Sequence, residues 1–439
     1  MIASSRVAAF VTFTFLVFSA HVAGANAQRR SHPKAPAATQ TGRSPAQWVG
    51  IWGSSQTPPY GNETLPAGSL DEATLRETVH LSAGGKRLRV HLSNAFGERP
   101  LVLRRVVIAR PALGGPRGTV DSASAVTLAF HGRPGVSVPP GAEYLSDAID
   151  FDAAPGADIV VSLAIEAAPV TPTLHAGGRA TAFLLHGDHA GDAELRNAET
   201  NTRWYFLAGV EAEAPPNAHA LVAFGDSITD GHGATTDGND RWPDDLARRL
   251  NAAPVQHSLA VVNQGIGGNC LLQVCIGPPA LSRFDRDVIA VPGVREVIVL
   301  EGINDLGSLS RQQPQPPAVH AALVQRIEAA YVQMIERAHA HGIRAIGATL
   351  TPWGGSEYYH PDAQAEADRV AVNTWIRTGG AFDAVIDFEA AVRDPQHPDR
   401  MLLAYDSGDH LHPGPAGYRR MADSVHFSIL TSSQTAQRQ

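Results

Sequence analysis

The chain has only two cysteines among its 439 residues, Cys270 and Cys275. No paired CxxC or HExxH pattern accompanies them, so the sequence lacks the usual ligand sets of a zinc site. We therefore expect neither a metal site nor another cofactor. Because two thiols this close in sequence can be joined in an oxidising compartment, Cys270 and Cys275 are candidates for a disulfide.

The sequence also lacks an excess of positive charge. Its 35 Lys and Arg residues stand against 43 Asp and Glu residues, which gives a formal net charge of -8 at pH 7. A protein that grips a phosphate backbone needs a basic surface. We therefore do not expect nucleic acid as a partner.

Long apolar runs are missing after the first residues of the chain. At the N-terminus, Arg6 precedes an apolar run over 7–20, and the small residues 25–27 follow. This pattern is typical of an export signal, and we place its cleavage after residue 27. The run is short for the roughly 20 residues needed to span a bilayer. We predict a signal peptide over 1–27, a secreted or periplasmic protein, and no stable membrane anchor after cleavage.

Two further stretches precede the part of the chain that carries motifs. Residues 28–45 are rich in Pro, Ala, Thr and basic residues and too poor in apolar side chains to join a core, which indicates a linker. Residues 46–215 contain short segments with the period of two that is typical of strands. The stretches that carry this pattern or a β-branched apolar run are 87–92, 125–130, 159–165 and 204–210. We predict an all-β sandwich here, as an accessory domain.

The pattern changes over residues 216–439, where apolar segments alternate with amphipathic helices. We expect one helix with Pro243 in its first turn and another over 323–338 that ends before Gly342. The predicted strands are 221–224, 261–262, 297–300, 343–350 and 385–386. This alternation predicts an α/β domain in which crossover helices connect the strands of a parallel sheet.

A serine follows the first of these strands, in Gly225-Asp226-Ser227-Ile228. The carboxyl ends of parallel strands form the edge at which ligand crevices open. Ser227 is therefore a candidate nucleophile. Asp and Ser are also common in turns, where they bond their own backbone, so this motif alone decides little.

Near the C-terminus, Asp409 lies three residues ahead of His412. One turn of chain can join the two side chains. A carboxylate on one imidazole nitrogen orients the ring and stabilises the imidazolium, while the other nitrogen accepts the serine proton. We expect His412 to be the general base and Asp409 its partner, and His410 is the rival for the base.

Two other strands are followed by residues that can donate hydrogen bonds. Residues 263–269 contain three glycines, and Gly302-Ile303-Asn304-Asp305 follows the next strand. The order of the glycines matches neither GxGxxG nor GxxxxGK[ST], which disfavours a nucleotide site. A nucleophile, an oriented base and several donors together indicate nucleophilic acyl transfer.

With these four blocks the sequence resembles the SGNH (GDSL-type) hydrolase family, over about residues 218–430. The resemblance implies a three-layer α/β/α, flavodoxin-like domain with Ser227, Asp409 and His412 as the catalytic triad. It also implies an oxyanion hole formed by Ser227, Gly268 and Asn304; we select Gly268 rather than Gly267 by counting from Asn263. An α/β-hydrolase elbow, GxSxG, would need a second glycine that this sequence lacks.

The expected function is hydrolysis of short acyl esters through an acyl-enzyme, and the expected substrate is an O-acetyl group on a polysaccharide. The β-rich domain resembles accessory domains of secreted SGNH carbohydrate esterases in architecture. Two alternatives stay open. One is a lipase or lysophospholipase that uses the same residues on longer acyl chains, and the other is an inactive protein that binds glycans.

Overall fold

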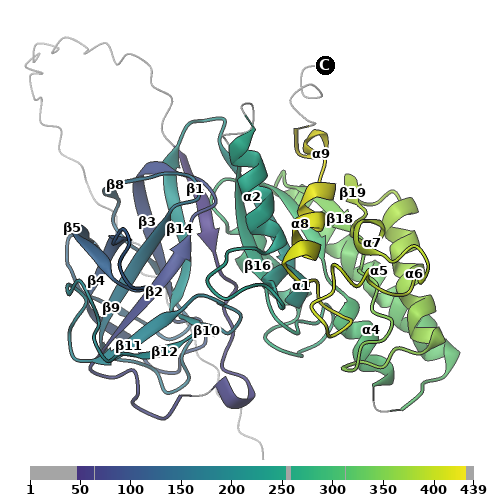
Figure 1. Ribbon diagram of the computed structural model, residues 1–439, viewed down its shortest axis with the longest axis horizontal. Helices are drawn as coiled ribbons and strands as arrows, with labels where there is room; N and C mark the ends of the chain where they lie inside the picture. The colour runs from purple at the N-terminus through teal and green to yellow at the C-terminus, as the bar shows by residue number, and fades with distance from the viewer. Residues whose placement is uncertain (1–46, 64, 254–258, 312, 432–439) are drawn as a thin grey trace, which may run out of the picture. The chain divides into compact units, whose positions relative to one another are not determined.

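The computed structural model describes residues 47–63, 65–253, 259–311 and 313–431 (Figure 1). These residues fall within one compact unit, Ser44–Gln439. The predicted signal peptide and linker lie outside the described residues. None of the described helices is long and apolar enough to cross a membrane.

The described residues 47–214, here called the β region, form antiparallel sheets. One sheet has the order β1-β14-β3-β7, with β8 beside β3; its strands are β1 (Gln47–Gly53), β3 (Gly85–Ser93), β7 (Glu143–Leu145), β8 (Ile149–Ala153) and β14 (Leu207–Ala214). The second has the order β12-β11-β2-β9-β4-β5, with β6 beside β4; its strands are β2 (Ala73–His80), β4 (Leu101–Pro111), β5 (Val120–Thr127), β6 (Val136–Val138), β9 (Asp158–Ala167), β11 (Ala182–His186) and β12 (Glu199–Asn201). A short 3-10 turn, η1 (Gly61–Glu63), and a two-stranded pair, β10 (Leu174–His175) with β13 (Trp204–Tyr205), complete the region. The prediction of an all-β domain is confirmed.

Alternation along β3 explains why this strand forms where the sequence predicts it. Leu88, Val90 and Leu92 are fully buried. On the opposite face, Arg87 and Arg89 form ion pairs with acidic side chains of the neighbouring strand β14. The side chains on one face of the strand therefore pack in the core, and the charged side chains on the other face form ion pairs.

Three of the predicted strands are shorter or interrupted in the structure. The run over 343–350 forms a strand only over Arg344–Ala348, and the other two lie in the β region. The run over 204–210 is divided into β13 and β14 because Phe206, between them, adopts a positive φ of 61°. The run over 125–130 ends at Thr127, and Phe130 instead pairs with Arg133 across a tight turn. Extended backbone ends where a residue turns into the left-handed region, whatever its strand propensity.

The described residues 218–431, here called the α/β region, contain a five-stranded parallel sheet of order β16-β15-β17-β18-β19. Its strands are β15 (His219–Gly225), β16 (Leu259–Gly265), β17 (Val294–Leu300), β18 (Arg344–Ala348) and β19 (Ala384–Ile386). This is the doubly wound order in which the second strand lies outside the first and the third lies on the other side. The predicted three-layer α/β/α fold is confirmed. The boundary that we place between 215 and 216 falls in the segment that joins the two regions, and it stays a prediction.

Helices cover the sheet, and α2, α7 and α8 pack together, as do α4, α5 and α6. The helices are α1 (Ser227–Asp230), α2 (Trp242–Ala252), α3 (Ala280–Phe284), the π-helix η2 (Asp285–Ile289), α4 (Ile303–Ser310), α5 (Pro317–Ala340), α6 (Ala363–Thr378), α7 (Phe388–Val392), α8 (Pro415–Ser424) and α9 (Phe427–Thr431). Pro243 lies in the first turn of α2, as predicted. Helix α5 includes the predicted apolar stripe and ends before Gly342.

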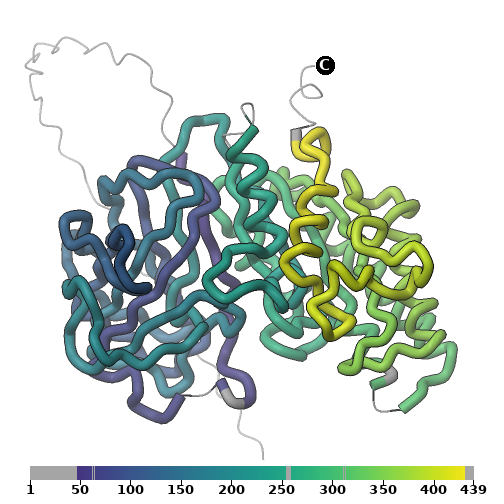
Figure 2. Tube along the Cα trace, in the orientation of Figure 1, coloured from purple at the N-terminus to yellow at the C-terminus, as the bar shows by residue number. Residues whose placement is uncertain are grey.

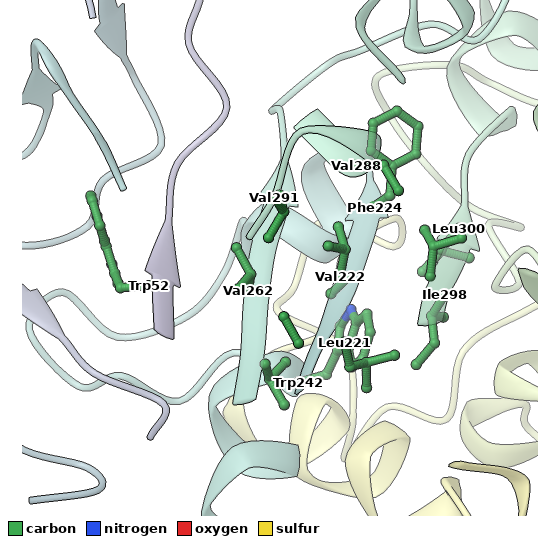
Figure 3. Close-up of a cluster of buried hydrophobic side chains, with 14 of the residues drawn as sticks. Trp52, Leu221, Val222, Phe224, Trp242, Val262, Val288, Val291, Ile298 and Leu300 are labelled. Carbon is green, nitrogen blue, oxygen red and sulfur yellow. The ribbon is translucent and has the colours of Figure 1, made fainter. Parts of the chain in front are cut away.

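The core of the α/β region is formed by apolar side chains from adjacent strands and from the elements that cover them (Figure 3). Both faces of these strands are covered by other elements, so the strands read as continuous apolar runs rather than as alternating ones. Buried side chains of β15, β16 and β17 in this cluster are Leu221, Val222, Phe224, Val262, Ile298 and Leu300.

Strand β1 of the β region packs beside the edge strand β16 of the α/β sheet, as the chain trace shows (Figure 2). The N–H of Gly50 in β1 donates to the carbonyl of Pro292 at 2.9 Å. A Cβ added at Gly53 would lie only 2.6 Å from a methyl group of Val262. The close approach of the two regions therefore depends on glycine at these two positions of β1.

Candidate active site

Ser227, His412 and Asp409 form a continuous chain of hydrogen bonds. Ser227 is the first residue of α1, directly after β15, and its Oγ lies 2.8 Å from Nε2 of His412. Nδ1 of His412 lies 2.6 Å from Oδ2 of Asp409. The structure thus brings together the three residues that are predicted from the sequence to form the triad, although Ser227 is 185 residues from His412.

The Asp409 carboxylate is held in its charged form. The backbone N–H groups of Leu411 and His412 donate to its Oδ1 at 3.0 and 2.8 Å. Burial works to raise the pKa of Asp409, but the hydrogen bond and charge of His412 outweigh it and hold this pKa well below its usual range. A charged carboxylate on Nδ1 leaves Nε2 of His412 as the proton acceptor toward Ser227.

Two other histidines of the α/β region, His410 and His232, lie close to this site. Nδ1 of His410 lies 2.6 Å from Oδ2 of Asp406, so the rival candidate for the base is engaged elsewhere. The ring of His232 lies against that of His412, with 4.1 Å between centroids. Burial and the charges of His412 and Arg179 lower the pKa of His232 to about 4, so at neutral pH its ring is uncharged.

Gly268 presents a backbone donor beside Ser227. Both residues line the same cavity. The N–H of Gly267 donates to Oδ2 of Asp230 at 2.9 Å, whereas that of Gly268 has no acceptor within the described part of the chain. Gly268 has a φ of 70°, and an added Cβ would lie 2.7 Å from Ile276. Glycine is thus required at the position whose N–H is free.

The amide of Asn304 is oriented by two hydrogen bonds. Its Oδ1 accepts from the hydroxyl of Tyr359 at 2.6 Å, and its Nδ2 donates to the carbonyl of Asn269 at 2.6 Å. One N–H of Asn304 remains for the cavity, which this residue also lines. Sequence reasoning missed Tyr359, because it lies 55 residues away in a loop without a recognisable motif.

Two buried carboxylates fix the loops that carry these groups. Asp226 caps α1 by accepting from the N–H of Ile228 at 2.9 Å, and burial raises the pKa of Asp226 to about 7. Asp305 accepts from two N–H groups of the loop that Cys270 and Cys275 close by a disulfide. Burial raises the pKa of Asp305 to about 6. Both aspartates position backbone rather than face the cavity.

Behind the cavity, the fully buried side chain of Arg283 ties three strand ends together. Its guanidinium donates to the carbonyls of Gly225 and Gln264 at 2.9 and 2.8 Å and to Oε1 of Glu301 at 3.1 Å. It also donates to the Ser55 hydroxyl of the β region at 3.0 Å. The strand ends that precede Ser227, Gly268 and Asn304 are thus joined by one cation, which the sequence analysis did not single out.

The cavity over Ser227 has a volume of about 690 Å³, and both regions line it. The β region contributes Thr57, Glu63, His175, Ala176, Gly177 and Arg179. Buried His175 joins this side to the loop of Gly267 and Gly268, because its Nε2 lies 3.1 Å from Oδ1 of Asp230, the carboxylate that accepts from the N–H of Gly267. The sequence analysis gave the β region no residue in the site, so this contribution is new.

One group of side chains in the described part of the chain could hold a metal ion. The ligand atoms of His232, Asp409 and His412 lie within 4.8 Å of one another. Two of the three residues already hydrogen bond to each other, and His412 also bonds to Ser227. A metal on Nδ1 of His412 would displace the proton that this hydrogen bond requires. The arrangement fits proton transfer better than metal binding.

Comparison with known proteins assigns a family to part of the chain. Residues 223–420 match the GDSL-like Lipase/Acylhydrolase family. No curated protein matches the chain.

Solved structures similar to this chain match about half of it. A protein of the lipolytic G-D-S-L family from Desulfitobacterium hafniense is 25% identical, covers 47% of this chain and 96% of its own, and has a TM-score of 0.34. A GDSL-like lipase from Bacteroides thetaiotaomicron is 17% identical, with coverages of 49% and 89% and a TM-score of 0.35. The acetyl xylan esterase AlAXEase is 21% identical, with coverages of 47% and 96% and a TM-score of 0.35.

Proposed function

We propose that the protein hydrolyses esters with Ser227 as its nucleophile, because residues 223–420 match the GDSL-like Lipase/Acylhydrolase family. The observation that carries the proposal is the unbroken chain from Ser227 Oγ through His412 to Asp409, at 2.8 and 2.6 Å, which opens on a cavity. Nucleophile, base and orienting carboxylate each have a partner at hydrogen-bonding distance.

In the proposed reaction, Nε2 of His412 takes the proton of Ser227 as its Oγ attacks the ester carbonyl. The negative charge that develops on the carbonyl oxygen is stabilised by three donors: the N–H groups of Ser227 and Gly268 and the amide of Asn304. His412 then returns the proton to the leaving alcohol. Water, activated by the same histidine, releases the acid from the acyl-enzyme.

We further propose that the substrate is a short acyl ester, such as an O-acetyl group on a polysaccharide. The cavity supports a substrate with many hydroxyl groups because Glu63, Arg179 and Glu357 offer polar contacts on its walls. We place the enzyme outside the cytoplasm, after cleavage of the signal over 1–27. Sequencing of the N-terminus of the exported protein tests this, and a start other than residue 28 would correct the cleavage site.

The decisive experiment compares acyl chain lengths and carriers. Purified enzyme should cleave an aryl acetate faster than the matching aryl ester of a long fatty acid, and it should release acetate from at least one acetylated polysaccharide. The Ser227→Ala variant serves as the blank in each assay. A preference for long acyl chains without acetate release from any glycan would favour the lipase alternative, and no turnover of any ester would favour the glycan-binding one.

A further inference from the structure

The guanidinium of Arg179 lies in the wall of the cavity without a partner. Arg179 lines the same cavity as Ser227 and His412. Its Nε atom is buried and makes no hydrogen bond. Within the described residues, the terminal nitrogens of Arg179 also have neither a hydrogen bond nor a carboxylate at ion-pair distance. A buried donor that stays unsatisfied is costly, so such a group calls for an explanation.

The backbone of Arg179 is held in an unfavourable conformation. Its φ is 45°, in the left-handed region that residues other than glycine rarely adopt. The N–H of Arg179 donates to the carbonyl of Thr202 at 3.0 Å, and its carbonyl accepts from the N–H of Asp237 at 2.8 Å. Strain of this kind persists where the surroundings fix it, and it gathers at ligand-binding sites.

A second arginine fixes the loop from the other side. Arg241 of the α/β region donates to the carbonyl of Gly178 at 2.6 Å and to that of Asp230 at 2.7 Å. The loop that precedes Arg179 is therefore clamped between the two regions. A side chain on a clamped backbone loses little further freedom when it binds a ligand.

The acidic side chains of the cavity have other partners or face solvent. Glu63 accepts from the N–H of Tyr60 at 3.1 Å, and Glu357 is exposed. Asp230 is engaged by His175 and Gly267. The charge of Arg179 contributes to lowering the pKa of His232, which lies against the catalytic histidine. The charge of Arg179 also contributes to lowering the pKa of Asp230. Within the described residues, however, no carboxylate lies at ion-pair distance from its guanidinium.

We propose that Arg179 binds a carboxylate of the substrate, so that the natural ester is one that also carries a negative charge. A planar guanidinium pairs with a carboxylate through two parallel hydrogen bonds, and this geometry would satisfy the unpaired donors. The inference rests on the proposed esterase function and names its substrate class. The carboxylate lies either on the alcohol part of the ester or on the acyl part.

The test measures preference for a charged ester in two arms. In the first arm the substrates are 4-acetoxybenzoate and the neutral 4-acetoxybenzamide, which place the charge on the alcohol part. In the second, 4-nitrophenyl hydrogen succinate is compared with 4-nitrophenyl butyrate, which places it on the acyl part. In at least one arm, Arg179→Gln should lower the charged-to-neutral ratio of kcat/KM by about 10- to 100-fold, mainly through KM. Arg179→Lys should retain part of the ratio.

Two controls keep the result specific. Arg133→Gln removes the same charge from an exposed position outside the cavity and should leave the ratio as in wild type. If Arg179→Gln folds poorly, Arg179→Asn replaces it, because asparagine tolerates a positive φ. A ratio that is the same in wild type and in the Arg179 variants, in both arms, would overturn the proposal.

A binding measurement separates this inference from the proposed function. Calorimetry with the Ser227→Ala protein should show that 4-acetoxybenzoate, or 4-nitrophenyl hydrogen succinate, binds more tightly than its neutral counterpart. In the double variant with Ser227→Ala and Arg179→Gln, this difference in affinity should disappear. If the wild type cleaves no ester but this difference is found, the esterase proposal fails and the anion site stands. If esters are cleaved but the charged ester binds no more tightly than the neutral one, the esterase proposal stands and the anion site fails.

Discussion

The two regions contribute to one cavity in different ways. In the α/β region, Ser227 and Asn304 come directly after strands β15 and β17, which are neighbours at the point where the strand order reverses. In the β region, His175 and Arg179 come from a two-residue strand and the loop behind it. The first region places the groups that we propose to react, and the second places the groups that hold and surround them.

This difference teaches how much of a site a short motif can reveal. A reacting group must sit at a fixed distance from a strand end, so it leaves a local pattern in the sequence. A group that forms a wall needs only to be brought there by the fold. Substitutions in the two regions should therefore act on different quantities, and four of them test the comparison.

The largest effect is expected for Ser227→Ala. Loss of the attacking oxygen should lower kcat by about 10⁴-fold or more, as for other serine nucleophiles. The melting temperature should stay close to that of wild type, because the hydroxyl contributes little to packing. Ser282→Ala, an exposed serine of the same region, is the matched control and should keep full activity. Equal loss in both variants would remove Ser227 from the reaction.

Arg283→Met should produce the largest effect on stability. The variant leaves Glu301 buried without its cationic partner and leaves Asp287 with Arg286 alone. Breaking a buried ion pair from one side costs about 3–5 kcal/mol in free energy of unfolding. Chemical denaturation measures this loss. Arg295→Met, on the exposed end of β17, should change stability little. A small loss for Arg283 would mean that the strand ends do not depend on this cation.

Asn304→Ala should lower kcat by roughly 10²- to 10³-fold with a smaller effect on KM, as expected when one oxyanion donor is removed. Tyr359→Phe keeps the amide but removes the hydroxyl that orients it, so its effect should have the same direction and be smaller. Steady-state kinetics on an aryl acetate measures both. An unchanged kcat in Asn304→Ala would exclude this residue as a donor.

The smallest effect is expected from the β region. His175→Gln should lower kcat by less than Asn304→Ala does, because His175 acts on Gly267 through Asp230. Combining it with Asp230→Asn should cost less than the sum of the two effects, since both break one chain of contacts. His186→Gln, exposed on β11, is the control. A loss of stability without a loss in kcat would mean that the β region stabilises the fold and does not contribute to the reaction.

The elements that the sequence predicts are those with a repeating pattern. The strands around Val90 and Val222 and the helix around Ile327 follow from their periodicity. The candidate triad and oxyanion residues follow from motifs of four to seven residues, and the structure brings all of them to one cavity. Their catalytic roles stay predictions until the variants are measured.

The residues that sequence reasoning missed act over long distances. Arg283 donates to a hydroxyl 228 residues away, and His175 reaches an aspartate 55 residues away. In the sequence, Arg283 is part of a run of charged residues that resembles a solvated helix face. Burial of a charge cannot be seen in a local pattern, because it depends on which partners the fold brings to it.

The Ser55 hydroxyl has a consequence beyond the site. Its oxygen lies 2.8 Å from Oε1 of Gln264 and 2.9 Å from Oδ2 of Asp287, either of which can accept its one proton, and it accepts from Arg283. The β region thus enters the polar core of its neighbour. Neither half can open without exposing charged groups of the other. Thermal unfolding should therefore be cooperative across both halves, with a single calorimetric transition rather than two. A chain cut at residue 216 would leave Arg283 and Asp287 of the α/β region open to solvent at this point.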